Sequence, residues 1–572
     1  MIDILAENIV SPLGMDTEQN WRAVLAGESA LRYLEGWHDL PQGIMAGVFS
    51  DEQNEKLLLG AYNRFESMAI RSIERALEKA GIDPTGERVL FVLSTTKGDI
   101  EELGRDSSKD RNYHGLASSA ARIAGHFGIS TSPIVSCNAC ISGVSAQLMA
   151  GRLMEAGLYD YAIVCGADCV SPFVAAGFLS FKSLSPQQCR PFDIDRLGLN
   201  LGEAAATLVL ARHSASHKGW SLMCGFMDND AYHLSAPSPT GEGALKVLKQ
   251  VLECADMEDV AFVNAHGTAT MFNDQMESLA IQKAGLSDMP LTALKCHYGH
   301  TLGASGVLEV ILSMKAVEEG VVLPVPSYAE RGVSGKVNVS SSLRQGKGHS
   351  FIKMISGFGG CNAAALYTTG VKDCVSDTLT LPEGKLMCSL RLDDKGLDID
   401  GSVLETESSG KALLTEIYKK YIGDYPKFYK MDMLGKLVFL ASELLLRRER
   451  ELGAASGLAS DSQDYSRAVI LFNRSASILS DRAHVVTMDK PDSFYPSPST
   501  FLYTMPNIVA GDIAIRHGYK GETSLNIMEV RDDKLITQVT ASTLAFYDSV
   551  LYAWVDCSAE DCFEAEFKII TK

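Results

Sequence analysis

The chain has 572 residues, of which 46% are hydrophobic and 22% charged, and its formal net charge at pH 7 is −19. This composition is typical of a folded globular protein, and the length predicts roughly three to four domains. The acidic excess and the lack of a long Lys/Arg stripe exclude broad nucleic-acid binding, because phosphates need basic side chains to neutralise them.

No apolar run reaches about 18 residues, so we expect no transmembrane helix. Residues 1–7 have neither a basic segment nor a small-residue cleavage site, so we expect no signal peptide. The 13 cysteines do not form the paired, regularly spaced CxxC motifs of a zinc site. They predict reduced thiols in a cytoplasmic protein without a metal.

Strand-like runs alternate with amphipathic helical runs through residue 370, which predicts a layered α/β fold. Residues 65–80 carry apolar side chains at helical spacing and predict a helix that ends at Gly81. Buried strands are predicted at 89–93, 162–165 and 260–264. Loops at strand ends commonly carry functional side chains, and the last of these strands leads directly to His266.

Cys140 lies between a β-rich run, 132–136, and a helical run, 141–158. This places it on a tight turn at a helix N-terminus, where backbone N–H groups and the helix dipole favour the reactive thiolate. A lone cysteine is more often a small buried hydrophobe, and Cys137 is interpreted that way. Further motifs are therefore needed to identify Cys140 as a nucleophile.

Those motifs follow in order along the chain. His266 lies in Asn-Ala-His-Gly-Thr-Ala-Thr, His300 ends Lys-Cys-His-Tyr-Gly-His, and a Gly-Phe-Gly-Gly-Cys-Asn turn begins at Gly357. Taken singly, a histidine beside a glycine is more often a loop residue with one backbone hydrogen bond, and Lys295 could be a solvated surface cation. Together they predict a thiol nucleophile assisted by two imidazoles.

The ordered set resembles the β-ketoacyl synthases, the condensing enzymes of the thiolase superfamily, over roughly residues 1–370. Shorter matches in the correct order are Ser11–Gly14, Trp21, Gly27–Ser29, Arg190–Asp193, Gly202–Glu203 and Gly303–Gly306. Two segments depart from the family pattern, Gly202-Glu-Ala-Ala-Ala206 and Arg196-Leu-Gly-Leu199. These departures concern turn flexibility and packing more than chemistry.

The resemblance implies a thiolase-like α-β-α-β-α fold of two similar halves, and it implies site roles. Cys140 would accept the acyl group, and His266 and His300 would bind the extender thioester and promote its decarboxylation. Lys295 would be a fourth catalytic residue, and Glu309 would support the site as its salt-bridge partner.

The resemblance also implies an oxyanion hole made by the backbone N–H groups of Cys140 and Phe358, with Gly359 allowing a close approach. Phe358 would in addition gate the acyl pocket. Thr268 and Thr270 would support the site. No bound cofactor is expected.

The implied partner is an acyl carrier protein with phosphopantetheine-linked acyl and malonyl groups, in a homodimer or a heterodimer with another synthase-like subunit. Because carrier proteins are acidic, docking requires a local basic patch. Lys56, Arg64, Lys182 and Arg190 are candidates, although each is more often ordinary surface. Fatty-acid, polyketide or polyene-type biosynthesis is the expected setting.

Two alternatives stay open. A non-catalytic subunit that sets chain length in a synthase heterodimer would lack the cysteine, whereas this chain keeps Cys140 and both histidines. A thiolase-type transferase would replace one histidine with a second catalytic cysteine, and both His motifs are intact here.

The predicted domains are 1–215, 216–372, a connecting segment at 373–410, and 411–572. The last begins with a predicted helical segment at 411–451, and residues 453–466, rich in small and polar side chains, predict a loop. The last domain resembles a second, truncated synthase N-terminal half, because 504–518 aligns with 116–128 and 546–556 with 158–168. In this second unit the position of Cys140 falls near Glu529 and Val530, and no cysteine occurs from 521 to 556. We expect it to be non-catalytic, with exposed apolar faces that require a packing partner.

Overall fold

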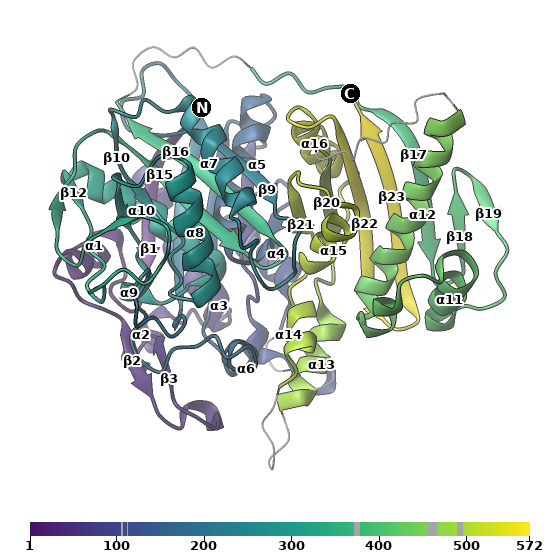
Figure 1. Cartoon of the computed structure of the whole chain (residues 1–572), viewed down its shortest axis with the longest axis horizontal. Helices are drawn as coiled ribbons and strands as arrows, with labels where there is room; N and C mark the ends of the chain where they lie inside the picture. The colour runs from purple at the N-terminus through teal and green to yellow at the C-terminus, as the bar shows by residue number, and fades with distance from the viewer. Residues whose placement is uncertain (105–106, 111–112, 371–377, 456–465, 489–495) are drawn as a thin grey trace.

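A computed structural model describes residues 1–104, 107–110, 113–370, 378–455, 466–488 and 496–572. The chain up to residue 370 forms one body, purple to teal in Figure 1, and the green-to-yellow remainder packs along its side. None of the described helices combines the length and apolar character that a membrane span requires.

The first sheet of the larger body has the strand order β5-β4-β6-β8-β1. Its strands are β5 Ile134–Ser136, β4 Val89–Ser94, β6 Tyr161–Asp168, β8 Ala204–Arg212 and β1 Ile2–Val10. The first three are parallel to one another, and β8 is antiparallel to both of its neighbours. The strands predicted at 89–93 and 162–165 are confirmed.

The second sheet has the order β9-β16-β15-β10-β11 and joins the first through three residues of β1. Its strands are β9 Trp220–Asn229, β16 Cys361–Thr369, β15 Ser350–Gly357, β10 Val260–Asn264 and β11 Pro290–Thr292. The predicted strand at 260–264 is β10. His266 follows its end.

Helices separate and cover the two sheets. Helices α5 (Ser142–Glu155) and α10 (Ser305–Glu318) contact strands of both sheets and lie between them. Helix α3 (Arg64–Ala80) covers the outer face of the first sheet, and α7 (Glu242–Cys254) covers that of the second. Helix α3 ends at Gly81, whose φ of 65° is left-handed, as its sequence predicts. The layered α/β prediction is confirmed.

The remainder of the chain builds a third sheet with the order β21-β20-β22-β23-β17. Its strands are β21 Thr523–Ile527, β20 Ala468–Asn473, β22 Ser549–Ala559, β23 Cys562–Thr571 and β17 Lys385–Asp393. The first three are parallel and β23 is antiparallel to its neighbours. Order and directions therefore repeat those of the first sheet.

The first and third sheets are joined edge to edge. Strand β21 pairs antiparallel with β5, and α16 (Asp533–Leu544) packs on α5 beside this joint. A buried ion pair also crosses the interface, because Lys97 Nζ lies 2.7 Å from Asp481 Oδ1. The two bodies therefore share one continuous sheet and part of one core.

The helical stretch predicted at 411–451 is interrupted. Helix α11 spans Gly410–Ile417 and α12 spans Met433–Ala455, with a π turn and a 3-10 turn between them. The break follows from Gly423, which is left-handed at φ 73°, and from Pro426. Most of the loop predicted at 453–466 lies outside the described residues. The third sheet begins before residue 411, since β17 lies within the predicted connecting segment.

The expectation of exposed apolar faces is wrong for the face of the third sheet that lies opposite α12. In the first sheet, Leu208 and Leu210 of β8 belong to the apolar core under α10. At the matching positions of β23, Lys568 pairs across from Tyr552, and Glu566 across from Trp554. Lys568 and Glu566 are 32% and 31% exposed and form an ion pair. Charged side chains therefore make the β23 part of this face a solvent surface, whereas α16 covers the part formed by β20 and β22.

Candidate active site

Cys140 lies where the first sheet meets the central helices. Strand β5 ends at Ser136, a 3-10 turn spans Ala139–Ile141, and α5 begins at Ser142. Ala139 has a left-handed φ of 48°, a strained conformation for a residue with a side chain. The turn brings Cys140 to a cavity of about 300 Å³.

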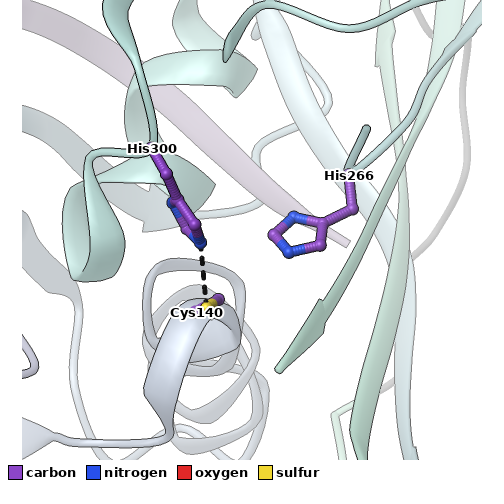
Figure 2. A group of neighbouring side chains, drawn as sticks. All are labelled: Cys140, His266 and His300. Carbon is purple, nitrogen blue, oxygen red and sulfur yellow. Dashed lines mark hydrogen bonds between the residues drawn. The ribbon is translucent and has the colours of Figure 1, made fainter. Parts of the chain in front are cut away.

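His300 contacts the thiol directly (Figure 2). Its Nε2 lies 2.9 Å from Cys140 Sγ. On the other side of the ring, the backbone N–H of Leu302 donates to Nδ1 at 3.2 Å. A neutral imidazole whose Nδ1 accepts a hydrogen bond carries its proton on Nε2, so His300 faces the sulfur as a donor.

His266 faces the same point from the opposite wall (Figure 2). Its ring centroid lies 5.2 Å from that of His300, at an interplanar angle of 80°. A nitrogen from each ring and the Cys140 sulfur lie within 4.8 Å of one another. The structure therefore brings together the three residues that the sequence motifs single out.

Burial sets the protonation of this group. It lowers the pKa of both His266 and His300 well below the usual value, and the positive charge of Lys295 lowers them further. Both rings are therefore neutral at pH 7. Burial also raises the pKa of Cys140 to about 12, which outweighs the smaller lowering by Lys295 and the backbone. The expected thiolate is thus wrong for the resting site, which holds a thiol.

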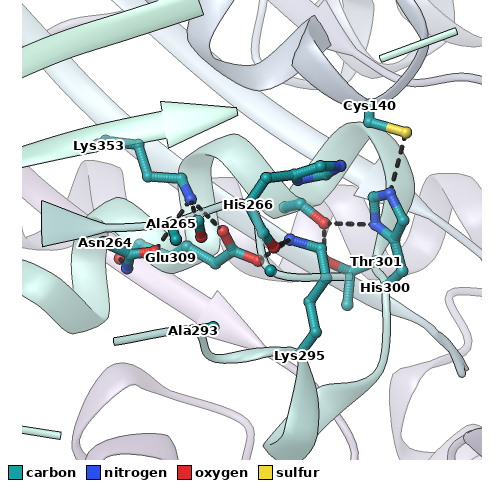
Figure 3. A network of polar contacts seen from close by, with 12 residues as sticks. Cys140, Asn264, Ala265, His266, Ala293, Lys295, His300, Thr301, Glu309 and Lys353 are labelled. Carbon is teal, nitrogen blue, oxygen red and sulfur yellow. Dashed lines mark hydrogen bonds and ion pairs between the residues drawn. The ribbon is translucent and has the colours of Figure 1, made fainter. Parts of the chain in front are cut away.

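A buried charge cluster lies beneath the histidines (Figure 3). Lys295 Nζ lies 2.7 Å from Glu309 Oε1, which is the predicted pair, and also donates to His266 O at 2.7 Å. Lys353 Nζ lies 2.5 Å from Glu309 Oε2 and donates to Asn264 Oδ1 at 3.0 Å. The Glu309 carboxylate therefore forms ion pairs with two ammonium groups.

Sequence reasoning missed Lys353. Burial, together with the charge of Lys295, lowers its pKa to about 8. The two lysines in turn lower the pKa of Glu309, although burial alone would raise it. The signal available in the sequence was a single lysine within the otherwise apolar strand β15.

Glu277 of α8 (Met271–Lys283) was also missed. Its two carboxylate oxygens accept the backbone N–H groups of His266 and Gly267, at 2.6 and 2.9 Å. With Lys295 holding the carbonyl of His266, the backbone at this histidine is fixed from both sides. The histidine ring is thereby aimed at the cavity while Nδ1 has no partner among the described residues.

The remaining predicted residues also line or border the cavity. Thr268 and Thr270 are hydrogen-bonded to each other at 2.9 Å on its wall, and Phe358 also lines it. The turn that carries Phe358 and Gly359 lies against the nucleophile, because a Cβ added to Gly357 would be only 3.2 Å from Cys140 N. A backbone oxyanion hole at this point stays a prediction.

The lining of the cavity includes several apolar side chains. Phe272, which is 74% exposed, lines it together with Thr268 and Thr270, and the apolar side chains of Phe178, Phe181 and Leu199 line it as well. Of the candidate docking cations, Arg64 is wrong, because it is held in ion pairs with Glu101 and Glu203.

Among the described residues, Cys140, His266 and His300 are also the group with ligand atoms close enough to hold a metal ion together. Zinc accepts such sulfur and nitrogen donors. The direct contact of 2.9 Å between Cys140 Sγ and His300 Nε2 leaves those two atoms hydrogen-bonded to each other. The expectation that the site binds no metal stays a prediction.

Comparisons with known proteins identify the family. Residues 2–216 match the family described as "Beta-ketoacyl synthase, N-terminal domain", and residues 221–329 match "Beta-ketoacyl synthase, C-terminal domain". The chain belongs to the β-ketoacyl synthase family. The C-terminal segment after residue 329 lies outside both matches.

Curated relatives match this chain along nearly their whole length. The 3-oxoacyl-[acyl-carrier-protein] synthase 2 of Rhizobium meliloti is 28% identical over 412 residues, which is 64% of this chain and 97% of the relative. The tetracenomycin polyketide synthase ketoacyl synthase alpha subunit of Streptomyces glaucescens is 27% identical over 401 residues, 62% of this chain and 94% of the relative.

Solved structures confirm the thiolase-like ketosynthase fold. The ketosynthase ApeO in complex with its chain length factor ApeC, from Xenorhabdus doucetiae, is 25% identical with a TM-score of 0.56, covering 64% of this chain and 98% of that one. The structure titled "PfaC Keto synthase-Chain length factor" is 14% identical with a TM-score of 0.76, and covers 100% of this chain and 78% of that one. At this identity the second likeness shows the fold alone.

Proposed function

We propose that this synthase performs the decarboxylative condensation of a Cys140-bound acyl group with a malonyl group on an acyl carrier protein. The observation that carries the proposal is the convergence of one thiol and two neutral imidazoles within 4.8 Å at the end of a cavity. The condensing chemistry needs a nucleophile and donors for a developing oxyanion at one point.

In the first half-reaction, Cys140 sulfur attacks the acyl thioester carbonyl, the carrier's C–S bond breaks, and the leaving thiolate takes the proton from Cys140. Burial keeps the resting thiol protonated, with a pKa of about 12, so proton loss must accompany attack. The Nε2–H of His300 contacts this sulfur and stabilises the charge that develops on it.

In the second half-reaction, the malonyl carboxylate leaves as CO₂ and the electron pair becomes an enolate on the thioester. Neutral His266 and His300 donate hydrogen bonds to the enolate oxygen, which needs N–H donors rather than bases. The enolate carbon then attacks the acyl carbonyl, the bond to Cys140 breaks, and the sulfur takes up one proton.

The cluster of Lys295, Glu309 and Lys353 holds this arrangement. Burial keeps the imidazoles neutral, and the two nearby ammonium groups lower their pKa further. The shared carboxylate compensates the charge of the lysines in this buried site. Phe358 and Gly359 would place a backbone donor opposite Cys140 for the acyl oxygen. The pantetheine arm would enter past Thr268 and Thr270.

The third sheet supports a second proposal, that the C-terminal segment takes the place of a partner subunit. It repeats the strand order of the first sheet and joins it through an antiparallel β5–β21 pair, as two copies related by a two-fold axis would. The full-length fold likeness to a keto synthase–chain length factor favours the same view. In the alignment of the two units, the position that corresponds to Cys140 falls near Glu529 and Val530, so the C-terminal unit contributes no nucleophile.

Intact-mass measurement tests the proposal. The full chain is incubated with a panel of acyl carrier-protein thioesters of different acyl length. We expect a mass increase of one acyl group on the wild type and none on Cys140→Ala, with Cys137→Ala as the matched control that still loads. Loading of Cys140→Ala to the wild-type level would overturn the assignment.

A further inference from the structure

The turn beside the nucleophile is held by a residue from the other body. Asn507 Nδ2 donates a hydrogen bond of 2.9 Å to the backbone carbonyl of Phe358, across 149 residues of chain. Asn507 is 1% exposed and occupies the N-cap position of α15 (Ile508–His517), where its side chain makes no capping hydrogen bond. The contact reaches a turn whose glycine, Gly357, lies against the backbone of Cys140.

The orientation of the Asn507 amide is determined by its surroundings. Nδ2 faces two acceptors, the Phe358 carbonyl and Cys361 Sγ at 3.9 Å. Oδ1 has no partner among the described residues. A flipped amide would place oxygen against the Phe358 oxygen, so the side chain must act as a donor here.

The same peptide group is held on its other side. The N–H of Gly359 donates to Leu234 O at 2.7 Å, so the peptide between Phe358 and Gly359 has both of its polar groups paired. Gly359 has a left-handed φ of 91°. The Phe358–Gly359 peptide shares the Phe358 Cα with the preceding peptide, so displacing it would move the Phe358 N–H, which is the proposed donor to the acyl oxygen.

Helix α15 approaches this turn at backbone distance. A Cβ added to Gly511 would lie 2.8 Å from Gly359 O and 3.0 Å from Gly359 Cα. The next carbonyl along the turn is also tied to the second body, because Asn229 Nδ2 donates both to Gly359 O at 2.8 Å and to Thr523 Oγ1 at 2.9 Å. Two independent contacts therefore connect the C-terminal body to the turn.

We infer that Asn507 is a positioning residue for catalysis, which holds the Phe358–Gly359 peptide so that the Phe358 N–H faces the acyl carbonyl on Cys140. The inference rests on the proposed condensation. It gives the C-terminal body a catalytic effect without any reacting group of its own. Misplacing a donor by about 1 Å can cost on the order of 100-fold in rate.

The test uses the full chain with Asn507→Leu, which keeps the approximate volume and removes the donor. We expect kcat for condensation to fall roughly 10- to 100-fold while KM for the carrier thioester changes less than about twofold. Asn338→Leu is the matched control, because its amide also donates to a backbone carbonyl, at 2.7 Å, but on the exposed far edge of the second sheet. That control should keep wild-type kcat.

Asn507→Asp should make activity depend on pH, an effect that a change in packing alone would not produce. An ionised carboxylate cannot donate to the Phe358 carbonyl, whereas a protonated one can. Activity relative to wild type should therefore be low at pH 8.5 and rise as the pH falls through the pKa of the buried carboxyl. Gly511→Ala should lower kcat as well, because its Cβ displaces the same turn while Asn507 stays in place.

The possible outcomes distinguish failure of the Asn507 inference from failure of the proposed condensation. Wild-type kcat in both Asn507→Leu and Gly511→Ala would overturn the inference and leave the condensation standing. So would an Asn507→Asp defect that is the same at every pH. If the wild type itself neither loads acyl groups nor condenses them, the proposed function fails whatever Asn507 does.

Discussion

Replacing Lys97 with methionine isolates one buried charge contact between the two bodies. Lys97 and Asp481 lie 2.7 Å apart, and their side chains are 5% and 4% exposed. Burial raises the pKa of Asp481 even with Lys97 beside it. In Lys97→Met this carboxylate loses its cation, so it must either stay buried and charged or take up a proton.

The cost of protonating the Asp481 carboxyl sets the size of the expected loss in the free energy of unfolding. Neutralising a carboxyl with a usual pKa of 3.8 at pH 7 costs about 4 kcal/mol, and removing one partner of a buried pair typically costs about 3–5 kcal/mol. We expect Lys97→Met to lower the free energy of unfolding by about 3–4 kcal/mol at pH 7. In the folded variant the carboxyl is protonated, whereas in the unfolded chain it is ionised above its usual pKa. Lower pH makes protonation cheaper, so this loss should shrink by about 1.4 kcal/mol for each pH unit below 7.

Equilibrium urea unfolding at pH 5, 6 and 7 measures the effect. Lys97→Met/Asp481→Asn should recover most of the stability, because no charge is left unpaired. Lys56→Met is the control, since the Lys56–Glu52 pair is 67% and 77% exposed and is screened by solvent, so its loss should change stability little. Equal losses in Lys97→Met and Lys56→Met, or a loss that does not depend on pH, would refute the reasoning.

Three further predictions follow from the site and from the third sheet. His300→Ala should still load acyl groups on Cys140 but lose malonyl decarboxylation by at least about 100-fold, as separate assays of the two steps would show; equal loss of both would indicate a structural role. Because burial lowers the pKa of both histidines, the acidic limb of the kcat profile should lie well below pH 6.5, and a limb centred near 6.5 would contradict neutral imidazoles. Glu566→Leu/Lys568→Leu should make the chain self-associate in light scattering, because it creates an apolar patch on an exposed face, and an unchanged mass would show that this face is covered.

Much of the larger body could be predicted from the sequence because local signals and fold agree there. The helix at 65–80 has helical apolar spacing and a terminal glycine, and Asn63 caps its start. The order of Cys140, His266 and His300 carried the resemblance, and the structure places all three at one cavity. The protonation of Cys140 could not be predicted, since it depends on burial by segments distant in the sequence.

In the C-terminal body, the sequence of β23 itself indicates which face of the third sheet meets solvent. Strand β23 alternates apolar and charged residues, from Phe563 through Glu564, Ala565 and Glu566 to Phe567, which is typical of a sheet with one face in solvent. The contact of Asn507 with Phe358 had no local signal. It exists only because the β5–β21 joint brings α15 against the turn.

Condensation with labelled extender tests the central claim most directly. Wild-type enzyme with its acyl group on Cys140 is mixed with malonyl carrier protein labelled with ¹³C in the free carboxyl group. Released ¹³CO₂ and 3-ketoacyl carrier protein are then quantified by mass spectrometry. The account predicts one ¹³CO₂ for each new carbon–carbon bond in the wild type, and no 3-ketoacyl product above background in Cys140→Ala, which cannot hold the acyl group. A 3-ketoacyl product in Cys140→Ala, or a wild-type product formed without an equal amount of ¹³CO₂, would contradict it.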